Sequence, residues 1–172
     1  MGLARSFSIG ALLGAWAAGP CAWAHGDGTN SRSASAARTQ TPWGIEGNPT
    51  AAARTVETRM TDDMRFAPDR IEVRQGDTVR FVVRNEGTML HGKVIGTREA
   101  LAEHAALMKK FPGMEHGEAY MIHVKPGGTG EIRWNFNRRG DFQFACLVAG
   151  HYQAGLVGAI RVKAVDTGNN KK

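Results

Sequence analysis

Apolar residues at alternate positions constrain this chain more strongly than any other feature of its sequence. Residues 79–83 place Val, Phe and Val on one face, and residues 132–136 do the same with Ile, Trp and Phe. Because successive side chains of a β-strand point to opposite faces, a period of two predicts strands with one buried face. Other short segments of this kind are separated by turn signals such as Pro126-Gly127-Gly128. We therefore expect an all-β sandwich of seven to eight strands.

One segment departs from this pattern and predicts a helix between Thr97 and Lys110. Thr97 can cap the first turn, Glu99 suits that turn, and lysines occupy the last turn, as the helix dipole favours. Its apolar stripe at helical spacing consists of Leu101, Ala105 and Met108. The helix would be an insertion between strands of the sandwich.

A cysteine and a histidine stand five residues apart near the end of the chain, at Cys146 and His151. Cys146 continues the alternation of Phe142 and Phe144, so its thiol should point toward the aromatic core. Thiolate and imidazole together favour a soft or borderline transition metal. The alternative is a buried cysteine that only packs as a small apolar residue.

This spacing resembles the ligand loop of the cupredoxins, the family of type-1 copper proteins, in which Cys-x4-His-x4-Met is the pattern. Cys146 and His151 match the first two positions, and Leu156 stands where the family has methionine. The resemblance implies a further histidine from an earlier strand, and His91 directly follows a strongly predicted strand. It therefore implies a Greek-key cupredoxin β-sandwich with one inserted helix and a single type-1 copper bound by His91, Cys146 and His151.

The resemblance covers residues 55–165 and is nearest to the periplasmic copper-tolerance cupredoxins of the CopI type. Those proteins share the Thr-Asp-Asp-Met-Arg-Phe stretch at residues 61–66 and the Ala-Leu-Met helix at residues 106–108. The implied function is electron transfer, copper tolerance or both, by a monomer that meets a redox partner or a copper donor or acceptor. Separately, the mild excess of basic residues gives a modest bias toward an acidic partner. Leu156 leaves the axial position open, either to no fourth ligand or to Met89 or Gln153.

The N-terminal 24 residues predict a signal peptide, because the apolar run at residues 7–18 is too short to span a bilayer and Ala22-Trp23-Ala24 suits cleavage after Ala24. We therefore expect a periplasmic protein without a membrane span. Cleavage also removes Cys21, which leaves one thiol in an oxidising compartment where a metal would justify it. Residues 25–54 then read as a flexible leader, residues 55–165 as the domain and residues 166–172 as a polar tail.

Two further groups could bind copper. His25 would be the mature N-terminus, where amine and imidazole form a bidentate Cu(II) chelate. Residues 104–123 are rich in Met and His, but packing and solvent exposure are the favoured explanation for them. These residues are His104, Met108, Met114, His116, Met121 and His123.

The charge distribution and the histidine spacing argue against two other classes of function. The chain carries 22 Lys plus Arg against 16 Asp plus Glu, but the basic residues are scattered, so nucleic-acid binding is not expected. A copper-dependent oxidase would need a second copper centre or a His-x-His pair, and the sequence contains no His-x-His. We expect no enzyme activity, and keep an oxidase-like enzyme and a metal-free structural sandwich as the alternatives.

Overall fold

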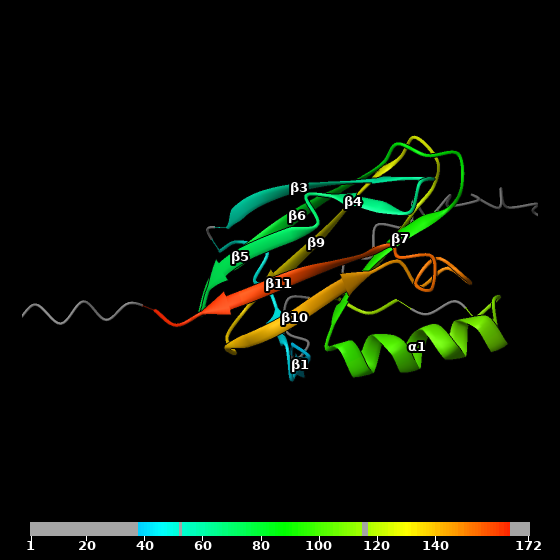
Figure 1. Ribbon diagram of the computed structural model, residues 1–172. Coiled ribbons are helices and arrows are strands. Elements are labelled where there is room, and N and C mark those ends of the chain that lie inside the picture. Colours follow the sequence, from blue (N-terminus) through cyan, green and yellow to red (C-terminus); the bar gives the residue numbers. More distant parts are fainter. Residues whose placement is uncertain (1–37, 52, 115–116, 166–172) are drawn as a thin grey trace, which may run out of the picture. The chain divides into compact units, whose positions relative to one another are not determined.

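The computed structural model describes residues 38–51, 53–114 and 117–165. They form two β-sheets and one helix (Figure 1). The first sheet has the order β1-β2-β9-β6-β3-β4, with β1 at Gln40–Thr41, β2 at Gly44–Glu46, β9 at Thr129–Asn135, β6 at Thr78–Asn85, β3 at Arg54–Thr61 and β4 at Arg65–Ala67. The second has the order β5-β11-β10-β7-β8, with β5 at Arg70–Arg74, β11 at Val157–Lys163, β10 at Gly140–Ala145, β7 at His91–Gly96 and β8 at Met121–Val124.

The alternating apolar residues fill the space between the two sheets. Phe81 of β6, Trp134 of β9 and Phe144 of β10 are all fully buried in one continuous core. This arrangement confirms the predicted β-sandwich with one inserted helix. The described residues contain eleven strands, more than the seven to eight expected, because β1, β2 and β4 have only two or three residues each. Such short strands carry too few residues to display a period of two.

The prediction of a flexible leader over residues 25–54 is wrong where β1 and β2 lie. β2 pairs with β9 through Ile45 and Asn135, so the domain begins before residue 55. Trp134 donates a hydrogen bond from Nε1 to the carbonyl of Trp43 at 3.1 Å. The local composition does not indicate these strands, because they are stabilised by pairing with the sheet rather than by their own sequence. The predicted signal peptide, the first part of the leader and the polar tail lie outside the described residues.

The helix α1, at Arg98–Lys110, agrees with the prediction. The Thr97 side chain caps it by accepting a hydrogen bond from the Ala100 amide at 3.1 Å. Its apolar stripe packs on the outer face of β7 and β10, where it forms a second buried cluster. That cluster contains Val94, Leu101, Ala105, Met108, Met121, Ala145 and Leu147. In the part of the chain that the structure describes, no helix has the length and apolar character needed to cross a membrane.

The topology brings two distant parts of the chain to one end of the sandwich. β7 runs antiparallel to β10, with Val94 opposite Ala145, and β10 runs antiparallel to β11, with Ala145 opposite Val157. The start of β7 and the end of β10 therefore meet at the same end of the second sheet. The loop from Cys146 to Leu156 closes over that end.

Candidate metal centre

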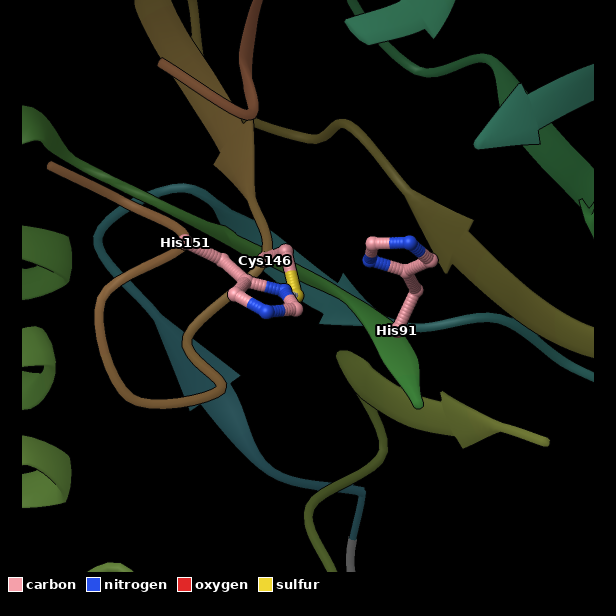
Figure 2. Close-up of side chains that lie close together, drawn as sticks. All are labelled: His91, Cys146 and His151. Carbon is pink, nitrogen blue, oxygen red and sulfur yellow. Dashed lines mark hydrogen bonds between the residues drawn. The ribbon is translucent and has the colours of Figure 1, made fainter. Parts of the chain in front are cut away.

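His91, Cys146 and His151 converge at this end of the sandwich (Figure 2). His91 is the first residue of β7, Cys146 directly follows β10, and His151 lies in the loop that leads to β11. One ligand atom from each lies within 4.8 Å of the other two. The thiol of Cys146 is 3.4 Å from Nδ1 of His151. The structure thus brings together all three of the predicted ligands, although they are separated by up to 60 residues in the chain.

The three side chains differ in their access to solvent. His91 and Cys146 are fully buried, whereas His151 is partly exposed. The two imidazole rings lie 4.9 Å apart between centroids, at an interplanar angle of 51°. A metal at this point would be shielded from solvent on the core side. The partly exposed imidazole of His151 would be its nearest side chain to solvent.

The two nitrogens of His91 have different surroundings. Nε2 lies 2.9 Å from Oδ1 of Asp62, while Nδ1 is buried and has no hydrogen-bond partner. Hydrogen bonds from Thr88 and from His91 hold the pKa of Asp62 well below its ordinary value, so this group is an ionised carboxylate that only accepts. Nε2 therefore carries the proton, and Nδ1 presents a lone pair toward Cys146 and His151 (Figure 2). An unpartnered buried nitrogen with a free lone pair fits a metal ligand.

The other two donors are neutral in the metal-free protein. Burial raises the pKa of the Cys146 thiol, while hydrogen bonds from the Val148 and Gly92 amides oppose part of that rise. The Gly92 amide lies 3.2 Å from the sulfur. Burial also lowers the pKa of His151 below its ordinary value, and neighbouring His91 lowers it further. His151 is thus a neutral imidazole at pH 7, as ligation requires, and a cation must displace the thiol proton.

The backbone of Leu156 connects the two ligands of the loop. Its carbonyl accepts from the Cys146 amide at 3.0 Å, and its amide donates to the His151 carbonyl at 3.1 Å. Its side chain is fully buried in the same core cluster as Cys146. Of the two other axial candidates, Met89 is 40% exposed and Gln153 is also exposed. An apolar, inward-facing side chain therefore occupies the position where the cupredoxin pattern has methionine.

Two neighbours of the site escaped sequence reasoning. Asp62 belongs to the Thr-Asp-Asp-Met-Arg-Phe stretch, but its contact with His91 crosses 29 residues and no local pattern indicates it. Gly92 places its amide on the sulfur, and a Cβ at that position would crowd the carbonyl of Ile122 and the ring of His123. Only the requirement for close backbone approach could have marked this glycine.

The residues rich in Met and His are divided by the structure. Met108 and Met121 are buried against the sheet, as the packing explanation expects. Met108, Met114 and His123 also line a cavity of about 680 Å³ whose other walls include Val148 of the ligand loop. His116 and the predicted second site at His25 lie outside the described residues.

Comparisons with known proteins agree on the class of this molecule. A family model described as multicopper oxidase matches residues 36–166. The copper-resistant cuproprotein CopI of Rubrivivax gelatinosus is 43% identical over 139 residues, which cover 81% of this chain and 84% of that protein. CopI of Pseudomonas aeruginosa is 35% identical over 141 residues, which cover 65% of this chain and 77% of that protein. The reduced auracyanin of Roseiflexus castenholzii superposes with a TM-score of 0.56 at 21% identity, over 65% of this chain and 98% of auracyanin.

The two-sheet sandwich and its structural neighbours define a cupredoxin fold, which confirms the predicted fold class. Within that class, and within the broader group that the multicopper oxidase model describes, the chain belongs to the CopI family of copper-resistant cuproproteins.

Proposed function

We propose that His91, Cys146 and His151 bind a single type-1 copper and that the protein acts in copper tolerance of the cell envelope. The observation that carries the proposal is the buried, unpartnered Nδ1 of His91 beside the thiol and Nδ1 of His151. One thiolate with two imidazoles is the donor set of blue-copper sites. The similarity to copper-resistant cuproproteins supports the biological role.

Copper at this site would supply a one-electron couple between Cu(II) and Cu(I). The contribution of the chain is to keep the donors in place in both states. His91 is fixed by β7 and Asp62, while Cys146 and His151 are tied to one another through the backbone of Leu156. The Gly92 amide donates to the sulfur and stabilises the thiolate once its proton has left. A rigid donor set serves an electron carrier, and it equally serves a protein that holds copper away from other targets.

A partner would reach the metal through the partly exposed edge of His151. Met89 and Leu90, which precede His91, are 40% and 44% exposed. We infer that this end of the monomer meets a redox protein or a copper donor or acceptor. Cleavage behind Ala24 would remove Arg5 and leave 21 Lys plus Arg against 16 Asp plus Glu, a formal net charge of +5 that gives a modest bias toward an acidic surface on that partner.

We further infer that the protein is not an enzyme. Within residues 38–51, 53–114 and 117–165, one cluster of three or more His, Cys, Asp and Glu side chains could hold a metal. An oxidase that reduces oxygen would need additional copper. The match to a multicopper oxidase model makes oxidase activity the second candidate, and oxygen uptake by the copper-loaded protein with phenolic or Cu(I) substrates tests it.

The proposed location is the periplasm, reached after cleavage behind Ala24. N-terminal sequencing of the exported protein tests this cleavage, with His25 as the expected first residue. Copper stoichiometry of His25→Ala against wild type then tests the second Cu(II) site. Equal stoichiometry in the two proteins would exclude a second site at His25.

The copper site itself is tested by titration of the purified protein with Cu(II). One equivalent should produce an intense visible band from thiolate-to-copper charge transfer. Cys146→Ser should abolish that band while circular dichroism shows an intact sandwich. An unchanged band in Cys146→Ser would refute the assignment, and a colourless wild type would favour the metal-free structural domain.

A further inference from the structure

A carboxylate at the turn between β3 and β4 makes an ordered contact with the proposed metal centre. Oδ1 of Asp62 lies 2.9 Å from Nε2 of His91, on the opposite side of the ring from the unpartnered Nδ1. Imidazole ligands commonly donate their second N–H to a carboxylate, which fixes the tautomer, orients the ring and makes it a stronger donor. Asp62 stands where such a group must stand.

The Asp62 carboxylate is itself held in place by the loop that leads to His91. Oδ2 accepts from both the amide and the hydroxyl of Thr88 at 2.7 Å, and Oδ1 also accepts a longer bond from the Met89 amide at 3.4 Å. Gly87 leaves room for this arrangement, because a Cβ there would overlap the carboxylate. Both oxygens are thus occupied by donors, and the group has one orientation.

The loop is braced from its other side by Asn85, which is almost fully buried. Its Oδ1 accepts from the Gly87 amide at 3.0 Å, and its Nδ2 donates to the carbonyls of Met89 and Val124 at 2.8 and 2.9 Å. Residues 85–91 therefore cannot shift freely to accommodate another orientation of His91. The position of Asp62 is specified by the fold rather than by a flexible surface contact.

We propose that Asp62 is a positioning residue that holds His91 in its metal-binding tautomer and tunes the copper bound there. This inference rests on the proposed copper site. With copper bound, the carboxylate makes His91 a stronger donor and places a negative charge near the metal. Both effects stabilise Cu(II) more than Cu(I), so Asp62 lowers the reduction potential.

An asparagine cannot replace this carboxylate, although it has the same shape. If its oxygen faces His91, its amide nitrogen meets the Thr88 amide, and two donors oppose each other. If its oxygen faces Thr88, its nitrogen donates to Nε2 of His91, which then must carry its proton on Nδ1. The second arrangement blocks the nitrogen that would bind the metal.

The test compares Asp62→Asn with Asp63→Asn. Asp63 is the neighbouring carboxylate of the same turn and bonds the Thr61 hydroxyl rather than His91, so this control removes the same charge. We expect Asp62→Asn to lose about 10- to 100-fold in Cu(II) affinity, to shift its visible band and to raise its reduction potential. Asp63→Asn should match wild type in all three measurements.

A readout without copper separates this inference from the proposed function. Nitrogen-15 NMR of the metal-free protein should show His91 protonated on Nε2 in wild type and Asp63→Asn, and on Nδ1 or on a mixture in Asp62→Asn. Equal tautomers, affinities and potentials in the two variants would overturn the role of Asp62. A wild type without the visible band would instead overturn the copper site.

If Asp62→Asn folds poorly, Thr88→Val provides a milder variant. It keeps a branched side chain but removes the hydroxyl that donates to Oδ2. The carboxylate then loses one of its two short anchors, and the band and potential should move in the same direction by less. Values identical to wild type in a folded Thr88→Val, together with a misfolded Asp62→Asn, would count against the inference.

Discussion

His91 and Lys93 are separated by one residue on β7, and both are fully buried, but their polar groups have opposite surroundings. His91 has a carboxylate on one nitrogen and an unpartnered lone pair on the other. Lys93 donates to the Thr58 hydroxyl at 2.9 Å and places its Nζ 3.8 Å and 4.3 Å from the ring centroids of Phe144 and Phe81. One residue is prepared for a ligand, whereas the other is enclosed by the protein itself.

This difference shows how a functional buried polar residue can be distinguished from a structural one. The unsatisfied atom of His91 lies at the end of the sandwich, where one loop supplies the complementary donors Cys146 and His151. The Lys93 amine lies between the sheets, where burial lowers its pKa well below the ordinary value and aromatic faces provide partial compensation. We therefore expect substitutions at the two positions to affect different properties of the protein.

The largest effect is expected from His91→Ala. Loss of a direct ligand should reduce Cu(II) affinity by more than the roughly 100-fold that the loss of a supporting residue gives. The visible band should disappear or change its character. Copper titration followed by absorption and electron paramagnetic resonance measures both. Retention of the wild-type spectrum would place the ligand elsewhere and remove the contrast with Lys93.

Lys93→Met should have the opposite effects from His91→Ala: the stability should rise and the copper spectrum should stay unchanged. Methionine has a similar length and removes an amine whose burial is only partly compensated, so the gain should be about 1–3 kcal/mol. Urea unfolding of the metal-free proteins measures it. Thr58→Val is the matched control, because it removes the hydroxyl partner of Lys93 and should destabilise the protein. A less stable Lys93→Met would show that the aromatic faces stabilise the amine more than burial disfavours it.

We also expect the free energy of unfolding to depend differently on pH in wild type and in Lys93→Met. The pKa of Lys93 is lowered in the folded state, so above that pKa the unfolded chain binds one more proton than the native protein. The wild-type free energy of unfolding should therefore rise with pH up to the unfolded lysine pKa of about 10.4. Lys93→Met should lack this component. If the free energy of unfolding of the two metal-free proteins changed equally with pH between neutral pH and pH 10, this expectation would be contradicted.

The smallest effect is expected from Leu156→Met. This substitution tests whether Leu156, which is also fully buried, faces the metal or only the core. A thioether would donate weakly to copper and stabilise Cu(II), so the reduction potential should fall relative to wild type. The packing cost should stay below about 1.5 kcal/mol because the volumes are similar. Redox titration in one buffer decides the result. An equal or higher potential would mean that Leu156 belongs to the core alone or that another group already fills the axial position.

Sequence reasoning succeeded where the determining interactions are local or periodic. Alternation predicted β6 and β9, the Thr97 cap and apolar stripe predicted α1, and the spacing of Cys146 and His151 placed both donors in one loop. His91, which lies far from this loop in the chain, was indicated only by the resemblance to the cupredoxins, and Asp62 was missed. Nothing near Asp62 indicates that it meets His91.

Lys93 illustrates the same limit in the core. The alternation of side chains along β7 puts His91 and Lys93 on one face, but lysine is usually a solvent-facing residue. Only the arrangement of Phe66, Phe81 and Phe144 around its amine, contributed by three other strands, accounts for its burial. Three-dimensional neighbours of this kind have no signature in a single sequence.

The pairing of β5 with β11 has a consequence for how the protein matures. These parallel strands join residues 70–74 to residues 159–163, so the second sheet is incomplete until residues 159–163 have emerged. Contacts between such distant residues form slowly during folding. The loop that carries Cys146 and His151 lies between β10 and this final strand, and copper that prefers the native state adds to its stability only after the strand has docked. Copper should therefore slow unfolding more than it speeds folding, and a newly made chain would complete its fold before it competes for the metal.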